Sequence, residues 1–171
     1  KIAETRIIVD IPEFMWQLGY EPFPTRLAKD GFAPAPSTHD GLLFADQDHS
    51  LTHSSLELVE SMIFAGLMTF DGSDLESMAQ ERFWHGDMGW YGPHGIGTTY
   101  GLSGFKQYHQ GPFLEAFPDR KGGNHNARFA DGHYIASTGW PSLNATHKGS
   151  YLGIAATNMP ITRRVMDWWR A

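Results

Sequence analysis

A hairpin signal in the second half of the chain constrains the fold most strongly. The tripeptide Ala-Asp131-Gly132 separates two segments with the composition of strands, 124–129 and 133–139. Asp-Gly between such segments is typical of a tight β-hairpin, because its residues readily adopt the left-handed conformations of the turn. Further strands are expected around 146–155 and 162–170, so this half of the chain predicts an antiparallel meander.

The residues before this meander have helical signals. A Ser-Ser-Leu-Glu run has the spacing of a capping box, and the apolar residues after it share one helical face, which predicts a helix over 55–70. A second helix is expected over 73–83 and a third over 102–117, where Pro112 should kink or split it. With a short strand at 87–91, this order of elements predicts an α+β fold with an antiparallel sheet.

The N-terminal residues predict a small separate unit. Residues 1–9 have the composition of a strand, and a short helix follows that ends at Gly19. Four prolines then lie within 20–53, which prevents regular structure over a stretch too long for an ordinary internal loop. We therefore expect a linker at 20–53 between a first unit, 1–19, and the main body, 54–171.

Composition limits the classes of function. The chain has 171 residues, of which 41% are apolar and 13% aromatic, enough for one domain with a core and an extension. A net charge of −6, with scattered lysines and arginines, argues against a nucleic-acid partner. The absence of cysteine excludes disulfides, thiolate metal sites and a cysteine nucleophile. No apolar run is long enough to cross a membrane and no signal peptide is visible, so we expect a soluble, cytoplasmic protein.

Five short motifs follow one another along the main body. They are Trp90-Tyr-Gly-Pro93, Gly101-Leu-Ser-Gly-Phe105, Pro112-Phe-Leu-Glu-Ala-Phe-Pro118, Phe129-Ala-Asp-Gly132 and Thr146-His-Lys-Gly149. In this order they resemble the SnoaL-like polyketide cyclase family. The resemblance implies a cone, in which a curved antiparallel sheet is wrapped by about three helices around an apolar pocket. It also implies a homodimer formed through the open face of the sheet.

The two ends of the chain resemble the end of a unit of the same family, in reversed order. The matching pieces are Asp167-Trp-Trp-Arg170 for the strand before the last one, and Lys1-Ile-Ala-Glu4, Asp10 and Gln17-Leu-Gly19 for the closing strand and helix. Such an order fits a slice of a tandem repeat, a circular permutant or a strand exchanged between subunits. We therefore expect residues 1–9 to pair antiparallel with 162–170, in the same subunit or in its partner.

The resemblance also implies an activity. Founding members of the family perform an intramolecular aldol cyclisation of polyketide esters, with no metal or cofactor. We therefore expect cofactor-free acid/base chemistry, a cyclisation or an isomerisation, on a small apolar carbonyl compound. An epoxide or lactone hydrolase on the same fold is an alternative enzyme. A non-catalytic module that holds an apolar ligand in an aromatic pocket is the alternative from another class.

Three polar residues are candidates for the chemistry. Asp10 matches the family's acid/base carboxylate, and burial would raise its pKa toward the working pH. Its spacing to Glu13 is also that of a helix cap. His147 matches a polar position of the pocket and would hold the substrate carbonyl. Asp167 is a second candidate acid if its face of the last strand points inward, and we expect Asp10 to share a pocket with His147, Asp167 or Trp169.

Four residues are candidates for substrate contacts. His85 lies where the second helix meets the first strand, near the expected mouth of the cone, although its surroundings also suit a helix end. Trp90, Tyr91 and Trp169 are expected to form walls of the pocket, with ordinary core packing as the alternative.

Histidines raise the question of a metal site. His125 and His133 flank the hairpin, and His147 follows on a nearby strand. Three imidazoles on one sheet could bind zinc or iron. These three are not spaced as His-x-His or His-x₃-His, so we predict no metal and no cofactor.

Overall fold

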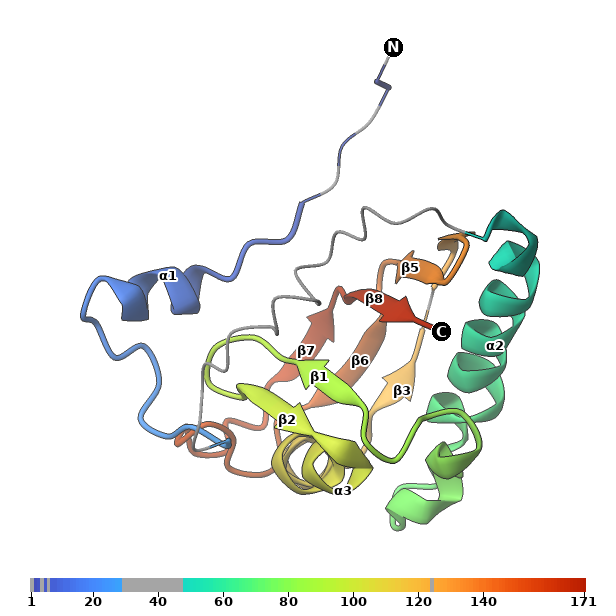
Figure 1. Ribbon diagram of the computed structural model, residues 1–171. Helices are drawn as coiled ribbons and strands as arrows, with labels where there is room; N and C mark the ends of the chain where they lie inside the picture. The colour runs from blue at the N-terminus through green and yellow to red at the C-terminus, as the bar shows by residue number, and fades with distance from the viewer. Residues whose placement is uncertain (1, 4, 6, 29–47, 124) are drawn as a thin grey trace.

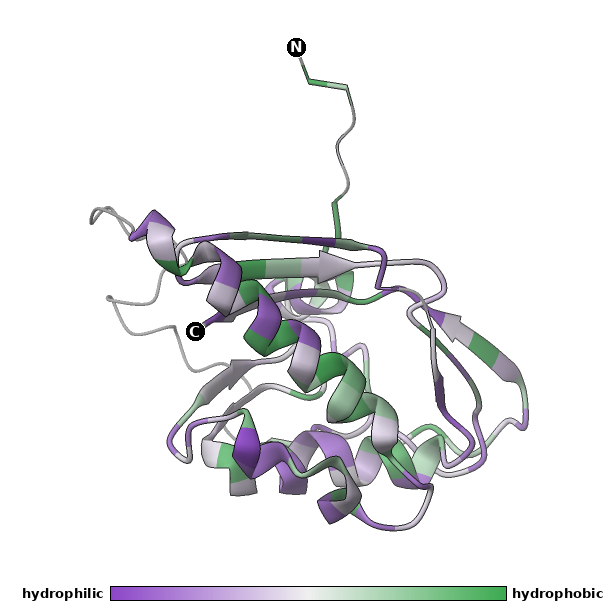
Figure 2. Cartoon of the chain, turned by 90° about the vertical axis from the view of Figure 1, so that its right-hand side faces the viewer, coloured by the Kyte–Doolittle hydropathy of each residue, from purple (hydrophilic) through white to green (hydrophobic). Residues whose placement is uncertain are grey.

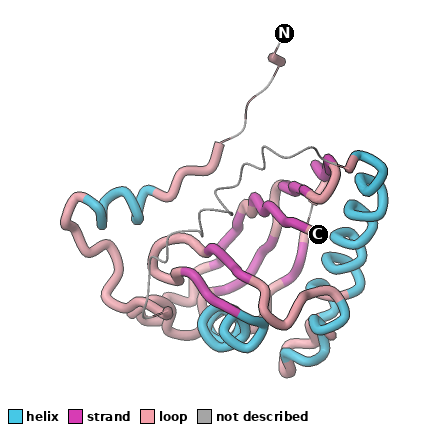
Figure 3. The backbone as a smooth tube through the Cα atoms, viewed as in Figure 1, coloured by secondary structure: helices cyan, strands magenta, loops and turns pink. Residues whose placement is uncertain are grey.

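The computed structural model describes residues 2–3, 5, 7–28, 48–123 and 125–171, and within them the chain has an α+β fold (Figure 1). The α-helices are α1 Ile11–Gln17, α2 Thr52–Ala65, α3 Gly101–Phe105 and α4 Gly111–Ala116. The strands are β1 Gly89–Tyr91, β2 Thr98–Tyr100, β3 Lys121–Gly122, β4 Ala127–Asp131, β5 Tyr134–Thr138, β6 Leu143–Thr146, β7 Pro160–Arg163 and β8 Met166–Arg170. Figure 3 shows strands in the middle of the body, α2 along one side and α1 apart on the other.

The strands form three small antiparallel sheets, β1–β2, β3–β6–β7 and β4–β5–β8. The predicted hairpin is confirmed, because β4 pairs with β5 across the turn at Asp131-Gly132. The single strand predicted over 162–170 is instead two strands that belong to different sheets. Ser142 holds the chain between β7 and β8 in place. Its N–H donates to the carbonyl of Arg163 and its hydroxyl accepts from the N–H of Val165, both at 2.8 Å.

The strand predicted over 146–155 is wrong beyond Thr146. The N–H groups of Lys148 and Gly149 donate to the carbonyl of Ala116, at 2.8 and 3.0 Å, which satisfies the free end of α4. The chain then turns through Leu152, whose φ of 53° is incompatible with a strand. This segment therefore docks on α4 instead of extending the sheet.

The long helix α2 covers the β4–β5–β8 sheet, as its apolar face predicts. Val59, Met62 and Ile63 are buried against Ile135 of β5, and Trp169 of β8 packs against the same cluster. Figure 2 shows this helix crossing the sheet, with apolar and polar residues alternating along it. Residues Leu67–Thr69 add the 3₁₀ turn η2, so the helical run predicted over 55–70 is confirmed with a break at Gly66.

The other two predicted helices form with irregularities. The third is a continuous helical run of α3, a π-helical turn η5 at Lys106–Gln110, and α4. The wide turn lies just before Pro112, which has no N–H to donate and is disfavoured inside a regular α-helix. The second is not an α-helix but two 3₁₀ turns, η3 Leu75–Met78 and η4 Gln80–Arg82, because Ala79 between them is left-handed with φ of 44°.

The N-terminal segment differs from its prediction. Its described residues before α1 form no strand, and β7 and β8 pair with β6 and β5 respectively, so the expected pairing within the same chain is wrong. Ile7, Ile8 and Val9 are exposed instead. The helix predicted after them is confirmed as α1, with Asp10 at its N-cap. An exchange of this segment between subunits stays a prediction.

Part of the predicted linker packs on the body. The N–H groups of Leu27 and Ala28 donate to the carbonyls of Gly95 and Ile96, both at 2.9 Å, and Ala28 is buried. The remainder, 29–47, lies outside the described residues. Within the residues that are described, no helix is long and apolar enough to cross a membrane.

Candidate active site

A stripe of four rings runs along the helical segment from α3 to the end of α4. Phe105, His109, Phe113 and Phe117 are spaced four residues apart, which places them on one face. Successive ring centroids are 5.2, 5.9 and 4.9 Å apart. Trp90 of β1 stacks on His109, with centroids 4.3 Å apart and planes 14° apart. The stripe and Trp90 together form one aromatic wall of the interior, and a contact of Trp90 with a substrate stays a prediction.

His109 is a neutral imidazole inside this wall. Burial, followed by the charges of Arg163 and Arg120, lowers its pKa to about 3. Its Nδ1 atom is buried and has no hydrogen-bond partner within the described residues. Sequence reasoning missed His109, although the four-residue spacing of the rings was a usable signal.

Arg163, the last residue of β7, carries a positive charge into the same interior. Its guanidinium lies 5.3 Å from the centroid of Phe113, and no hydrogen bond or ion pair of this side chain occurs among the described residues. Its charge acts on His109, Tyr151 and Asp167, because it contributes to the pKa of each. Arg163 is therefore the residue that connects the polar groups of this interior.

Tyr151 supplies a hydroxyl beside the aromatic wall. Its ring stands edge-on to Phe113 and Phe117, at centroid distances of 6.0 and 5.4 Å. The hydroxyl is buried without a partner in the described part of the chain. Burial raises the pKa of Tyr151 to about 12 against the opposing charge of Arg163, so the phenol stays protonated and can donate a hydrogen bond.

Asp167 lies on the inward face of β8, which is the condition set for it by the sequence. Asp167 and Trp169 are partly buried, whereas Trp168 and Arg170 are exposed. Across the sheet Asp167 is paired with Ser137, which is buried. Burial raises the pKa of Asp167 to about 6, and the charge of Arg163 opposes this rise. The carboxylate is thus a base with a pKa close to neutrality.

His147 joins the same interior from the end of β6. Its ring stacks on Phe117 with centroids 5.3 Å apart, and its Nδ1 lies 3.1 Å from the hydroxyl of Thr157. The second ring nitrogen, Nε2, is buried and has no partner within the described residues. His147 and Tyr151 therefore both contact Phe117. Nε2 of His147 and the hydroxyl of Tyr151 each lack a hydrogen-bond partner within the described residues.

Asp10 makes the helix-cap contact that its spacing to Glu13 predicted. One carboxylate oxygen accepts from the N–H of Glu13 at 3.1 Å, and the other accepts from the N–H of His94 at 2.7 Å. Glu13 in turn lies 2.9 Å from Nδ1 of His94. The structure thus brings Asp10 together with Glu13 and His94, and it records no contact of this described side chain with His147, Asp167 or Trp169. Asp10 caps α1 and ties it to the loop at His94.

The remaining predicted contact residues separate into two groups. Trp90 belongs to the aromatic wall, and Trp169 packs against the α2 cluster. His85 is exposed in the turn before β1, where its carbonyl accepts from the N–H of Met88. Tyr91 is also exposed, at 46%. Across the described segments, no three histidine or carboxylate residues gather as metal ligands would.

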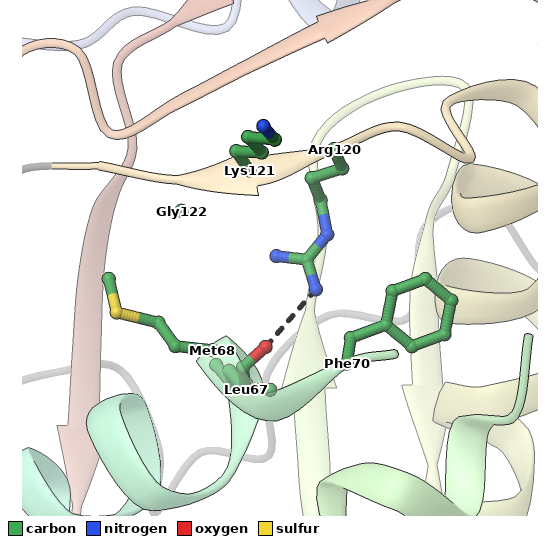
Figure 4. A pocket seen from close by; sticks show the side chains of 6 residues that line it. All are labelled: Leu67, Met68, Phe70, Arg120, Lys121 and Gly122. Atoms are coloured by element: carbon green, nitrogen blue, oxygen red, sulfur yellow. Dashed lines mark hydrogen bonds between the residues drawn. The ribbon is translucent and has the colours of Figure 1, made fainter. Parts of the chain in front are cut away.

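A cavity of about 320 Å³ lies at the edge of this interior (Figure 4). It is lined by Leu67, Met68, Phe70, Arg120, Lys121 and Gly122. Leu67 packs against both core clusters, the one around Phe113 and the one under α2, so the cavity lies where the two meet. Arg120 donates from Nη2 to the carbonyl of Leu67 at 3.2 Å, and its charge acts on His109.

Comparison with solved structures shows the same fold. A proposed SnoaL-like polyketide cyclase from Jannaschia sp. CCS1 aligns with a TM-score of 0.58 and 11% identity, over 74% of this chain and 83% of that one. The proposed hydroxylase AclR from Streptomyces galilaeus aligns with a TM-score of 0.50 and 19% identity, over 70% of this chain and 80% of that one. No family model and no curated protein sequence matches the chain. The chain therefore has a SnoaL-like fold.

Proposed function

We propose that the protein carries out cofactor-free acid/base chemistry, of the aldol or isomerisation type, on a small apolar carbonyl compound. The observation that supports this most is the carboxyl of Asp167, partly buried beside Arg163 with a pKa of about 6. An ordinary aspartate is too weak a base to deprotonate carbon at neutral pH, whereas a desolvated one has gained basicity and is still ionised at pH 7. Asp167 takes the role first considered for Asp10.

The proton and the electrons have defined places in this reaction. Asp167 removes a proton from the carbon next to the carbonyl, and the electrons of that C–H bond move onto the carbonyl oxygen to form an enolate. The guanidinium of Arg163 and the phenol of Tyr151 stabilise this negative oxygen, because both are donors without partners among the described residues. In an isomerisation the protonated Asp167 returns the proton to another carbon. In an aldol closure the enolate carbon first bonds to a second carbonyl carbon of the substrate, whose C=O electrons move onto its oxygen, and Asp167 gives the proton to this new alkoxide.

The walls of the interior suit an apolar, flat substrate. In this proposal Trp90, Phe113 and Phe117 contact the apolar body of the substrate, and Trp90 is held in place by its stack on His109. His109 is neutral, so it adds no second positive charge that would repel the guanidinium of Arg163. The Nε2 atom of His147 offers a further contact for a substrate oxygen.

A test of this proposal needs no knowledge of the natural substrate. The α-protons of 2-tetralone exchange with D₂O through the enolate, and proton NMR follows their loss. We expect the protein to accelerate this exchange and Asp167→Asn to lose the acceleration, while Asp131→Asn, an exposed carboxylate on β4, keeps it. No acceleration by the wild-type protein, or equal rates for Asp167→Asn, contradicts the proposal and favours a binding module.

A further inference from the structure

We infer that the substrate carries a carboxylate, which Arg120 binds in the cavity between η2 and β3. This inference rests on the proposed function, because it names the substrate class for the same interior. The inference concerns a different residue from the proposed function. Asp167 and Arg163 act on the reacting carbonyl, whereas Arg120 holds a group that does not react.

The Arg120 side chain is set into the cavity with few partners. Figure 4 shows it reaching from the start of β3 toward η2, with the ring of Phe70 beside it and the side chain of Lys121 directed away. Its one hydrogen bond within the described residues is from Nη2 to the carbonyl of Leu67, at 3.2 Å. The Nε atom is buried without a partner in those residues. Other N–H donors of the guanidinium fork therefore remain for a ligand.

Among the described residues, no aspartate or glutamate forms an ion pair with this arginine. Arg128 and Arg26, by contrast, pair with Glu60 and Glu21 at 2.7 and 3.2 Å. The residues that line the cavity include no aspartate or glutamate. A cation that is desolvated without a counter-ion is costly, and burial lowers the pKa of Arg120 for this reason. A bound carboxylate would supply the missing charge in the bidentate geometry that a guanidinium prefers.

The side chains around Arg120 favour a ligand whose remaining atoms, apart from the carboxylate, are apolar. Leu67, Met68 and Phe70 provide apolar walls, and the guanidinium lies 5.7 Å from the centroid of Phe70. A volume of about 320 Å³ suits a small organic molecule. Leu67 and Phe70 also pack against the cluster that holds Phe113 and Phe117. A ligand anchored at Arg120 therefore lies beside the core cluster that contains part of the aromatic wall.

A pair of matched probes tests the inference. 2-Naphthoate and 2-naphthamide have the same ring system and nearly the same shape, but only the first is an anion. Calorimetric titration of the wild-type protein should give roughly tenfold or greater preference for 2-naphthoate, the size expected for hydrogen bonds to a charged group. Equal affinities, or binding of neither probe at millimolar concentration, overturn the inference.

Three variants assign the preference to its residue. Arg120→Gln should lose the preference while 2-naphthamide still binds, which shows that the cavity has survived. Arg120→Lys keeps the charge without the fork and should give an intermediate preference. Arg170→Gln is the matched control and should behave as wild type, because Arg170 is exposed at the end of β8 and does not line the cavity. A preference that persists in Arg120→Gln, or that is lost in Arg170→Gln, overturns the assignment.

The same variants separate this inference from the proposed function. Asp167→Asn should lose the exchange of 2-tetralone protons and keep the preference for 2-naphthoate. Arg120→Gln should keep the exchange of 2-tetralone protons, since 2-tetralone has no carboxylate for Arg120 to bind, and should lose the preference for 2-naphthoate. If Asp167→Asn loses the preference for 2-naphthoate, the anion is not bound by Arg120 as inferred, whatever happens to catalysis.

Discussion

Asp167 and Ser137 face each other across β8 and β5, and both side chains are on the side of the sheet that α2 covers. This pairing removes the carboxyl from water. Between pH 3.8 and about 6 the folded chain holds a proton on Asp167 that the unfolded chain releases. Stability contributed by this group therefore falls as pH rises through that window, and stays lower above it.

Asp167→Asn should accordingly stabilise the protein where the wild type has a charged carboxylate. We expect a gain of about 1–3 kcal/mol at pH 7.5, because the pKa shift of about two units corresponds to that order of free energy. At pH 3.5 the gain should largely vanish, since the wild-type group is then protonated. Urea unfolding at both pH values measures the difference, and an equal effect at the two would contradict the burial of this charge.

His109 should show the opposite dependence on pH. Its pKa is depressed from 6.5 to about 3, so the unfolded chain takes up a proton in this window and the folded chain does not. Stability should therefore fall as pH falls from 6.5 toward 3. His109→Phe keeps a ring on Trp90 and should reduce this acid loss by roughly 1–3 kcal/mol. Thermal unfolding at pH 7 and pH 4.5 compares the two proteins, and an unchanged acid loss in the variant would show that another group causes it.

Asp10 should matter for α1 and not for the chemistry. Asp10→Ala removes the acceptor for the N–H groups of Glu13 and His94, and the loss of an N-cap typically costs about 1 kcal/mol. We expect faster hydrogen exchange of the α1 amides, with the exchange rate of 2-tetralone protons unchanged. If Asp10→Ala abolishes that rate, Asp10 is the base after all and the assignment to Asp167 fails.

The elements that were predictable from sequence depend on nearby residues. The hairpin followed from its Asp131-Gly132 turn, and α2 from its apolar face. The Ser-Ser-Leu-Glu run does not cap α2 as predicted, because the helix begins earlier, at Thr52. The expectation that Asp167 and Trp169 share one face of β8 followed from the alternation of side chains along a strand. By contrast, the break between β7 and β8 depends on two hydrogen bonds with Ser142, some twenty residues earlier, one donated by its N–H and one accepted by its hydroxyl. No local sequence pattern marks this break.

The candidate site was harder to predict, because its residues come from distant segments. Asp167, His147 and Trp90 were proposed from strand alternation and from the motifs, and their roles stay predictions. Arg163 was not proposed from the sequence, since an arginine near a strand end is ordinarily exposed. It points inward only because the chain passes from one sheet to another between β7 and β8. The resemblance led to Asp10 as the base, but the pairing it required is not formed within this chain.

The outer face of the β4–β5–β8 sheet carries an apolar pair that supports the predicted homodimer. Phe129 and Trp168 flank Ala136 in the register of the sheet, with ring centroids 6.0 Å apart. They are 57% and 67% exposed. Two large aromatic side chains exposed together on a sheet face are characteristic of an interface. We propose that a second copy of the chain covers this face.

Light scattering at micromolar concentration should therefore give twice the monomer mass. Phe129→Ser combined with Trp168→Ser should give a monomer, whereas Tyr20→Ser, an equally exposed aromatic residue near α1, should leave the dimer intact. Deletion of residues 1–9 separates this interface from an exchange of the N-terminal segment. If the dimer survives that deletion and is lost in the double variant, the sheet face holds it together. If the deletion alone yields a monomer, the exposed Ile7, Ile8 and Val9 pair with the partner, and the sheet face does not form the dimer.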